Sequence, residues 1–190
     1  MLANMVFFVL VAVVGGLSTS WYMIEKGTRL TSQRSGPWIM WETAGHPDAD
    51  PYTRAHHMRR GTLPITSALA EIHQATTDSD GQPLYSSCEY AVEGEEPQGA
   101  FWTLAVFDDE GRIIPNPADR HSFNSTTLMR GPGRRLDVVL ARNARPGNWL
   151  PTGGAGRLAL HLTVEEPRPA SAGPDAARAP MPAIRRVACR

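Results

Sequence analysis

The chain has 190 residues and a mass of 20.7 kDa, and its 19 basic and 19 acidic side chains give a formal net charge of zero. This balance disfavours nucleic-acid binding by overall basicity, and a hydrophobic fraction of 42% disfavours wholesale disorder. The 17 glycines and 16 prolines interrupt the chain too often for a helical bundle, and two cysteines exclude a four-thiolate zinc site.

Residues 1–24 form an apolar segment without a charged side chain. About 20 apolar residues cross the hydrocarbon core of a bilayer as a helix, and Trp21 and Tyr22 lie where aromatic rings prefer the membrane interface. A cleaved signal peptide and a buried helix are the alternatives. The segment lacks a basic start, and its apolar run continues to Ile24, so both are disfavoured. We therefore predict one transmembrane anchor that contacts membrane lipid.

Residues 25–35 are predicted to be a juxtamembrane linker, which carries Lys26, Arg29 and Arg34. If only the basic residues of this flank are counted, the positive-inside rule places the following domain in the cytoplasm. The other flank depends on the choice of start codon, so the charges alone leave the orientation open.

Residues 36–166 are predicted to be the folded body, a β-sandwich domain. Its opening is rich in glycine, proline and aromatic residues and shows no strand alternation. Asp50 followed by Pro51 predicts a short helix, because aspartate is a good N-cap and proline suits the first helical position. Gly61 would end this helix. Residues 65–84 combine helix-favouring side chains with an Asp-Gly turn, and a strand is the favoured interpretation.

Short runs of strand character follow, separated by turn residues. They cover residues 84–92, 101–107, 135–141 and 157–164. In the last run leucine or valine alternates with other side chains, which indicates a strand with one buried face. The predicted fold is mainly β: a jelly-roll-like antiparallel β-sandwich preceded by one N-terminal transmembrane helix and a short helix.

Residues 167–190 contain five arginines and show no periodicity, so we expect a disordered basic tail rich in proline, alanine and arginine. Cys88 lies in a predicted strand and Cys189 in this tail. A bridge between them would close a loop of about a hundred residues. A lone buried thiol at Cys88 is the more usual outcome, and the pairing stays open.

The sequence shows no established catalytic or metal-binding signature. It contains neither HExxH nor GxSxG, and its glycine-rich stretch lacks the lysine of a phosphate loop. The acidic residues around Asp48 and Asp78 lack the complete pattern of a calcium loop, so turns explain them better. We therefore expect no catalytic residue, no metal site and no cofactor.

The order of motifs in the second half resembles the bacterial family called domain of unknown function 1214. The matching motifs are residues 101–104 (FWTL), 108–111 (DDEG), 116–117 (NP), 120–121 (RH) and 148–151 (NWLP). The front portion is similar to a short, singly anchored subgroup of that family. The resemblance implies a jelly-roll-like sandwich tethered outside the cytoplasm, and it carries over no reaction, cofactor or catalytic residue. One departure is the closing strand, which ends in HLTV at residues 161–164.

The favoured hypothesis is a non-catalytic envelope domain, an interaction or accessory module, held by a single pass in the inner membrane with the domain in the periplasm. The alternatives are a carbohydrate-binding or weakly glycan-active sandwich, with an envelope glycan as ligand, and an accessory subunit of a membrane protein complex. Tryptophans beside polar groups can stack sugars, although such rings more often lie in the core. The candidate ligand-binding residues are Trp102, Arg120, His121, Arg145, Asn148 and Trp149.

Overall fold

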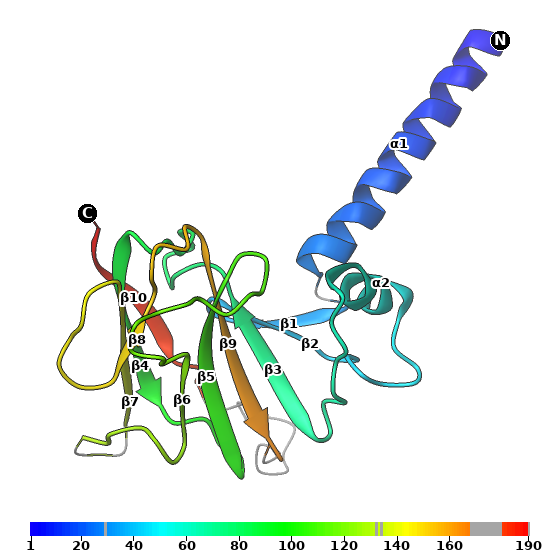
Figure 1. Ribbon diagram of the computed structural model, residues 1–190. Coiled ribbons are helices and arrows are strands. Elements are labelled where there is room, and N and C mark those ends of the chain that lie inside the picture. Colours follow the sequence, from blue (N-terminus) through cyan, green and yellow to red (C-terminus); the bar gives the residue numbers. More distant parts are fainter. Residues whose placement is uncertain (29, 132, 134, 168–179, 190) are drawn as a thin grey trace. The chain divides into compact units, whose positions relative to one another are not determined.

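The computed structural model describes residues 1–28, 30–131, 133, 135–167 and 180–189 (Figure 1). The chain divides into two compact units. We call Met1–Gln33 with Trp41–Ser67 the helical unit, and Arg34–Met40 with Ala68–Arg190 the β unit.

The helical unit begins with α1, Leu2–Lys26, in which no residue is buried. Its most apolar stretch has a mean hydropathy of 2.1, and the helix is long and apolar enough to cross a membrane. The prediction of an apolar N-terminal helix is thus confirmed. The helix runs past the predicted anchor and includes Glu25 and Lys26.

The second helix of this unit, α2, spans Pro51–Arg60. The Asp50 carboxylate accepts hydrogen bonds from the backbone N–H groups of Tyr52 and Thr53, both at 3.0 Å. Gly61 closes the helix in the left-handed conformation, with φ at 62°. The helix therefore begins and ends at the residues that its local signals predict.

Helix α2 packs against the C-terminal end of α1. His56 Nδ1 lies 2.7 Å from the Ile24 carbonyl oxygen. Arg59 Nε lies 3.0 Å from Glu25 Oε1, and the Arg59 guanidinium carbon stands 3.9 Å from the centre of the Trp21 ring. A hydrogen bond, an ion pair and a cation–π contact thus hold the two helices together.

The pKa of His56 is lowered to about 4, mainly because the side chain is buried. The hydrogen bond to the Ile24 carbonyl raises the pKa, but by less than burial lowers it. The charges of Arg60 and His57 lower the pKa further. The unfolded chain binds the proton first, so stability should fall as the pH drops from about 6.5 towards 4. We expect a loss on the order of 3 kcal/mol.

Thermal unfolding of the full chain in micelles across this pH range would measure the loss. The variant His56→Gln should have a flatter stability profile than the unaltered chain. Equal profiles for the two proteins would contradict a neutral, buried His56.

The described strands form two sheets (Figure 1). The six-stranded sheet has the order β1-β2-β3-β9-β5-β6, and the four-stranded sheet has the order β10-β4-β7-β8. In the first sheet the bounds are Ser32–Ser35 (β1), Trp38–Trp41 (β2), Ala70–Ala75 (β3), Leu158–Glu165 (β9), Phe101–Asp108 (β5) and Ser122–Asn124 (β6). In the second they are Ala183–Cys189 (β10), Cys88–Glu95 (β4), Arg135–Ala141 (β7) and Trp149–Pro151 (β8).

The pairings of β3 and β5 with β9, and of β7 and β10 with β4, are antiparallel, whereas β7 and β8 run parallel. The prediction of a mainly β fold with an apolar N-terminal helix and a short second helix is confirmed, and the strand-rich fold is consistent with a sandwich. Jelly-roll connectivity stays a prediction.

One apolar cluster draws its side chains from both sheets. Trp102 of β5 and Leu160 of β9 come from one sheet, and Tyr90 of β4 and Val138 of β7 come from the other. Because the same cluster includes both sets, these faces form a shared core. The alternation expected in the closing run is present except at one position: Leu158, Leu160, Leu162 and Val164 are buried as expected, but Ala159 between the first two is buried as well.

The prediction of a disordered tail is wrong for its last residues. Strand β10 pairs with β4, and Ile184 is fully buried. The Trp38 indole N–H donates to the Pro182 carbonyl at 2.7 Å. The backbone groups of β10 bond to the edge of β4, and the composition of the tail alone gives no sign of this distant partner. Residues 168–179 and residue 190, also assigned to the tail, lie outside the described residues.

The pairing of the two cysteines, which the sequence leaves open, is present, so the more usual outcome of a lone thiol does not hold. Cys88, at the start of β4, and Cys189, at the end of β10, form a disulfide across two paired positions of the four-stranded sheet. The two residues are 101 positions apart in the sequence. The register of β10 on β4 brings them together, and nothing near either cysteine in the sequence reveals that register.

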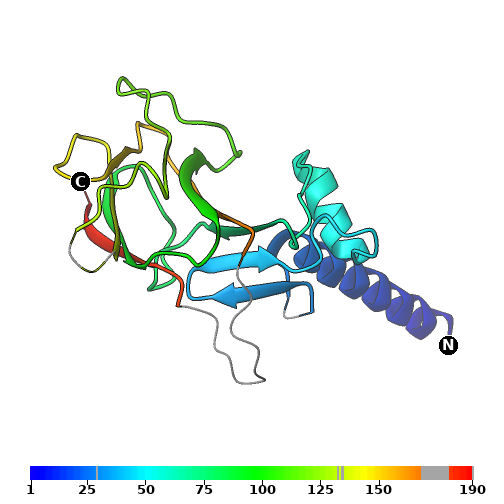
Figure 2. The same ribbon diagram turned by 90° about the horizontal axis from the view of Figure 1, so that it is seen from below.

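Besides β6, β8 and β10, two strands near the start of the chain lie where the sequence predicts none. β1 falls within the predicted linker, and β2 falls within the aromatic-rich opening of the body. The two strands are neighbours in the sheet (Figure 2). β2 is short, and both of its tryptophans are buried together with Met40. A short strand that is apolar throughout shows no alternation, which explains the missed prediction.

Candidate functional site

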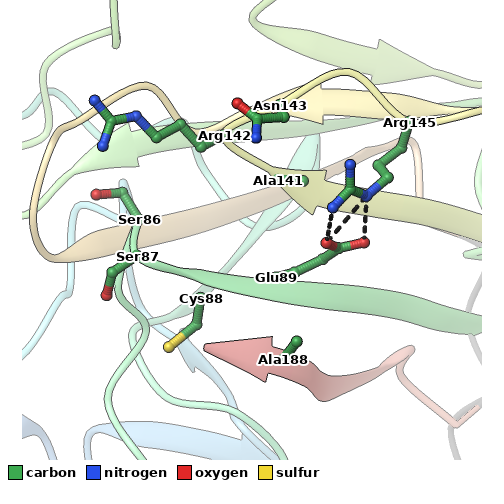
Figure 3. Close-up of a pocket in the computed structure, with 9 residues that line it drawn as sticks. All are labelled: Ser86, Ser87, Cys88, Glu89, Ala141, Arg142, Asn143, Arg145 and Ala188. Carbon is green, nitrogen blue, oxygen red and sulfur yellow. Dashed lines mark hydrogen bonds and ion pairs between the residues drawn. The ribbon is translucent and has the colours of Figure 1, made fainter. Parts of the chain in front are cut away.

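The β unit carries a pocket of about 460 Å³ beside the disulfide. Its walls come from the residues around the start of β4, from the loop that follows β7 and from β10 (Figure 3). The lining residues are Ser86, Ser87, Cys88, Glu89, Ala141, Arg142, Asn143, Arg145 and Ala188.

Hydrogen bonds fix two of these walls. Ser86 donates its backbone N–H to the Gly156 carbonyl at 2.7 Å, and its hydroxyl oxygen accepts from the Gly156 N–H at 2.9 Å. The Ala141 carbonyl accepts a hydrogen bond from the indole N–H of Trp149 at 2.9 Å. The two ends of the loop after β7 are therefore held to each other, and the three polar lining residues of that loop lie between them.

An ion pair lies on one side of the pocket. Arg145 Nε lies 2.9 Å from Glu89 Oε1, and Arg145 Nη2 lies 2.7 Å from Glu89 Oε2 (Figure 3). The hydrogen bonds and the charge of the Glu89 carboxylate raise the pKa of Arg145 above its usual value. Because this two-point contact occupies the carboxylate, Glu89 is poorly placed to accept a proton from a substrate.

Both partners remain partly exposed, at 34% and 20% of their side chains, so solvent weakens the pair. We expect the Arg145–Glu89 coupling energy to be about 1 kcal/mol or less. A double-mutant cycle with Arg145→Ala and Glu89→Gln, followed by urea unfolding at low and high salt, would measure it. The coupling should shrink as salt is added. A coupling of about 3 kcal/mol that ignores salt would instead indicate a buried pair.

The chemistry of the pocket suits binding better than acid–base catalysis. Apart from the Glu89 carboxylate, which Arg145 occupies, its polar side chains are serine hydroxyls, the Asn143 amide and guanidinium groups, with Arg142 and Arg145 on opposite sides (Figure 3). General acid–base catalysis works best with a side chain whose pKa lies near the working pH, and no histidine is among the lining residues. Across the described part of the chain, no group of three or more His, Cys, Asp or Glu side chains is placed to hold a metal ion.

Two of the residues expected to bind a ligand are buried inside the fold. Trp102 is 2% exposed, and its indole N–H donates to Glu96 at 3.3 Å. Asn148 is also buried. Its amide accepts from the Met129 N–H and donates to the carbonyls of Met129 and Asp137. Asn148 thus ties the start of β8 to β7 and to the segment before it.

Three other candidates lie outside the pocket. The Arg120 guanidinium donates to the Trp149 carbonyl at 3.2 Å, and His121 Nε2 lies 3.2 Å from Asp119 Oδ1. Tryptophans usually lie in the core, but Trp149 is only half-buried. The residue opens the short strand β8, and its ring forms the bond to Ala141 described above.

Arg145 is the one sequence-predicted candidate that lines this pocket. Sequence reasoning missed the other polar lining residues, which are Ser86, Ser87, Glu89, Arg142 and Asn143. They come from two segments more than fifty positions apart, and none belongs to a recognisable motif. The one signal in the sequence is the pair of serines directly before Cys88. These serines can be assigned to a pocket only once the fold places the loop after β7 opposite them.

A family model described as "Protein of unknown function (DUF1214)" matches residues 70–169, which is more than half of the chain. The chain belongs to this family. The match covers most of the β unit and confirms the family resemblance found in the sequence. Membership in the singly anchored subgroup stays a prediction. The description of the DUF1214 family assigns no activity, so what the pocket binds must be argued from its chemistry.

Two solved structures resemble this DUF1214 chain. The VPA0106 protein from Vibrio parahaemolyticus aligns with a TM-score of 0.58 and 21% identity, over 74% of this chain and 36% of its own. An uncharacterized protein from Burkholderia cenocepacia aligns with a TM-score of 0.42 and 15% identity, over 64% of this chain and 29% of its own. This chain therefore spans about a third of the Vibrio protein, with which it shares the fold. No curated protein matches it.

Proposed function

We propose that this DUF1214 chain is a non-catalytic, membrane-anchored envelope domain, an interaction or accessory module whose β unit lies in the periplasm. In this proposal α1 crosses the inner membrane once. The pocket beside the disulfide binds a small polar or anionic partner through hydroxyl, amide and guanidinium groups.

The observation that carries the proposal is the Cys88–Cys189 disulfide in a chain that begins with an apolar helix. Disulfides persist in oxidising compartments and are rare in the bacterial cytosol. The charges of Lys26 and Arg34 argue for the opposite orientation. We give more weight to the disulfide, because charge counts over one short flank are weak determinants of orientation.

The pocket supports the binding role. Glu89 is occupied by Arg145, whereas the Arg142 side chain is exposed. Figure 3 marks no bond between Arg142 and the other lining residues. A guanidinium group of this kind suits a carboxylate or phosphate group of a ligand. The carbohydrate alternative is weaker, because the lining residues include no aromatic ring on which a sugar could stack.

Reporter fusions would test the anchor and its orientation. Alkaline phosphatase fused after residue 190 leaves β10 in place and should be active, whereas green fluorescent protein at the same position should stay dark. The fusion should also resist carbonate extraction from membranes. Strong fluorescence without phosphatase activity would overturn the periplasmic assignment, and release by carbonate would overturn the anchor.

Trapping of thiols in intact cells would test the same proposal independently. The unaltered chain should react with an alkylating agent only after reduction, whereas Cys189→Ser should expose one reactive thiol once unfolded. Alkylation of both cysteines in the unaltered chain before reduction would place the β unit in a reducing compartment.

A further inference from the structure

Helix α1 leaves the hydrocarbon core near its C-terminal end. Residues 2–24 carry no charged side chain, and at about 1.5 Å per residue they extend about 34 Å, close to the roughly 30 Å of a hydrocarbon core. The boundary between hydrocarbon and headgroups therefore falls near Trp21 and Tyr22, where aromatic rings are favoured. This placement rests on the proposed anchor.

Helix α2 is held at the same depth. Arg59 pairs with Glu25 and stands over the ring of Trp21, and His56 lies within hydrogen-bond distance of the Ile24 carbonyl. These contacts all involve residues 21–25 of α1. A helix held there lies among the lipid headgroups, since each interfacial layer is about 5–7 Å thick.

The exposed surface of α2 and its neighbours is both cationic and apolar. The helix contains three arginines and no acidic residue. Arg54 donates to the Pro47 carbonyl oxygen and Arg59 pairs with Glu25, and each guanidinium keeps donors for a further partner because it carries five N–H groups. Large apolar side chains on α2 and in the segments that follow α1 and α2 are exposed: Met58 to 82%, Leu30 to 85% and Leu63 to 96%. Single exposed apolar residues are ordinary, but cationic and apolar side chains combine here as they do on helices that bind membrane surfaces. We call these residues together the collar: Leu30, Arg54, Met58, Arg59, Arg60 and Leu63.

We propose that the collar is a docking surface for anionic phospholipid, with arginines that bind headgroup phosphates and apolar side chains that enter the interface. Cations near an anionic membrane surface are attracted to it, and the attraction falls off within a Debye length. Guanidinium groups bind phosphate oxygens through paired hydrogen bonds. The collar thus orients the helical unit on the membrane in addition to the tether that α1 provides.

Hydrogen exchange of the full chain in lipid nanodiscs would test this surface. One set of discs contains phosphatidylcholine alone, and the other contains phosphatidylcholine mixed with phosphatidylglycerol. We expect the backbone amides of residues 52–63 to exchange roughly tenfold more slowly in the mixed discs. High salt should remove most of that difference.

The variant Arg54→Glu/Arg60→Glu should abolish the difference. Arg59 is left in place because it holds α2 to α1. The milder variant Arg54→Gln/Arg60→Gln should reduce the difference. It controls for unfolding of α2 in the first variant, because an unfolded α2 would exchange fast in both kinds of disc. The matched control Arg157→Glu changes an exposed arginine of the β unit and should behave as the unaltered chain does.

The outcomes for the collar and for the anchor are distinct. Equal exchange in both kinds of disc, with the chain firmly incorporated, overturns the collar and leaves the anchor intact. Failure of the chain to enter discs overturns the anchor itself. Protection of residues 52–63 that needs a co-purified protein, and not the anionic lipid, would show that a protein covers this surface and would also overturn the proposal.

Discussion

Replacing Cys189 by serine should lower the free energy of unfolding of the β unit by about 4 kcal/mol. The disulfide joins residues 101 positions apart, and in the chain-entropy model a loop of about 100 residues corresponds to roughly 4.7 kcal/mol. The same bond holds β10 to the edge of β4 at its far end. Without it, β10 depends on backbone pairing and on the burial of Ile184. Urea unfolding of the full chain in micelles, followed by tryptophan fluorescence, would give the difference.

Reductant provides the control for this prediction. The unaltered chain should lose a similar amount of stability when it is reduced, and Cys189→Ser should not respond to reductant at all. If Cys189→Ser and the oxidised chain unfold at the same urea concentration, the disulfide does not form or does not constrain the unfolded chain.

Replacing Trp102 by alanine should cost about 3–5 kcal/mol, because a buried aromatic ring is lost and a cavity is left behind. Trp102 lies on the inner face of β5, opposite Val164 of β9, and belongs to the core that both sheets share. Its indole N–H also donates to Glu96, which would lose that donor. Urea unfolding of the full chain measures this loss.

Trp149→Ala is the matched control, since the same side chain is removed from a half-buried position. It should cost about 1–2 kcal/mol, in line with a smaller buried area and one lost hydrogen bond to Ala141. Trp102→Phe should restore part of the stability by refilling the space. Equal losses for the two alanine variants would show that burial does not distinguish these tryptophans.

The sequence predicts a helix or strand well when the residues that determine it lie within or next to that element. The ends of α2 follow from Asp50, Pro51 and Gly61, each of which acts on the backbone within a few residues. β9 follows from the alternation of its apolar residues. β10 shows the limit of such signals: in AIRRVAC only Ile184 is buried, so the strand owes its existence to β4, which lies far away in the sequence.

The pocket is harder to predict because no single segment forms it. Ser87, Asn143 and Ala188 come from three parts of the chain, and their types are common on any protein surface.

The burial of the two tryptophans is equally hard to predict from the sequence. Trp102 and Trp149 both lie in aromatic–polar motifs, yet the first is buried within a long strand and the second is half-buried in a short one. Sheet position, which is a tertiary property, separates them.

The order of synthesis gives the Cys88–Cys189 pairing a consequence for biogenesis. Cys88 leaves the ribosome about a hundred residues before Cys189, at a typical rate of about 5–20 residues per second. During that delay β4 lacks its β10 neighbour, and the backbone groups along Tyr90–Glu93 remain open to pairing with other chains. Aggregation is thus most favoured in the newly made, incomplete chain. In the finished protein a protease cut before β10 would not recreate this state, because the Cys88–Cys189 disulfide still holds β10 to β4.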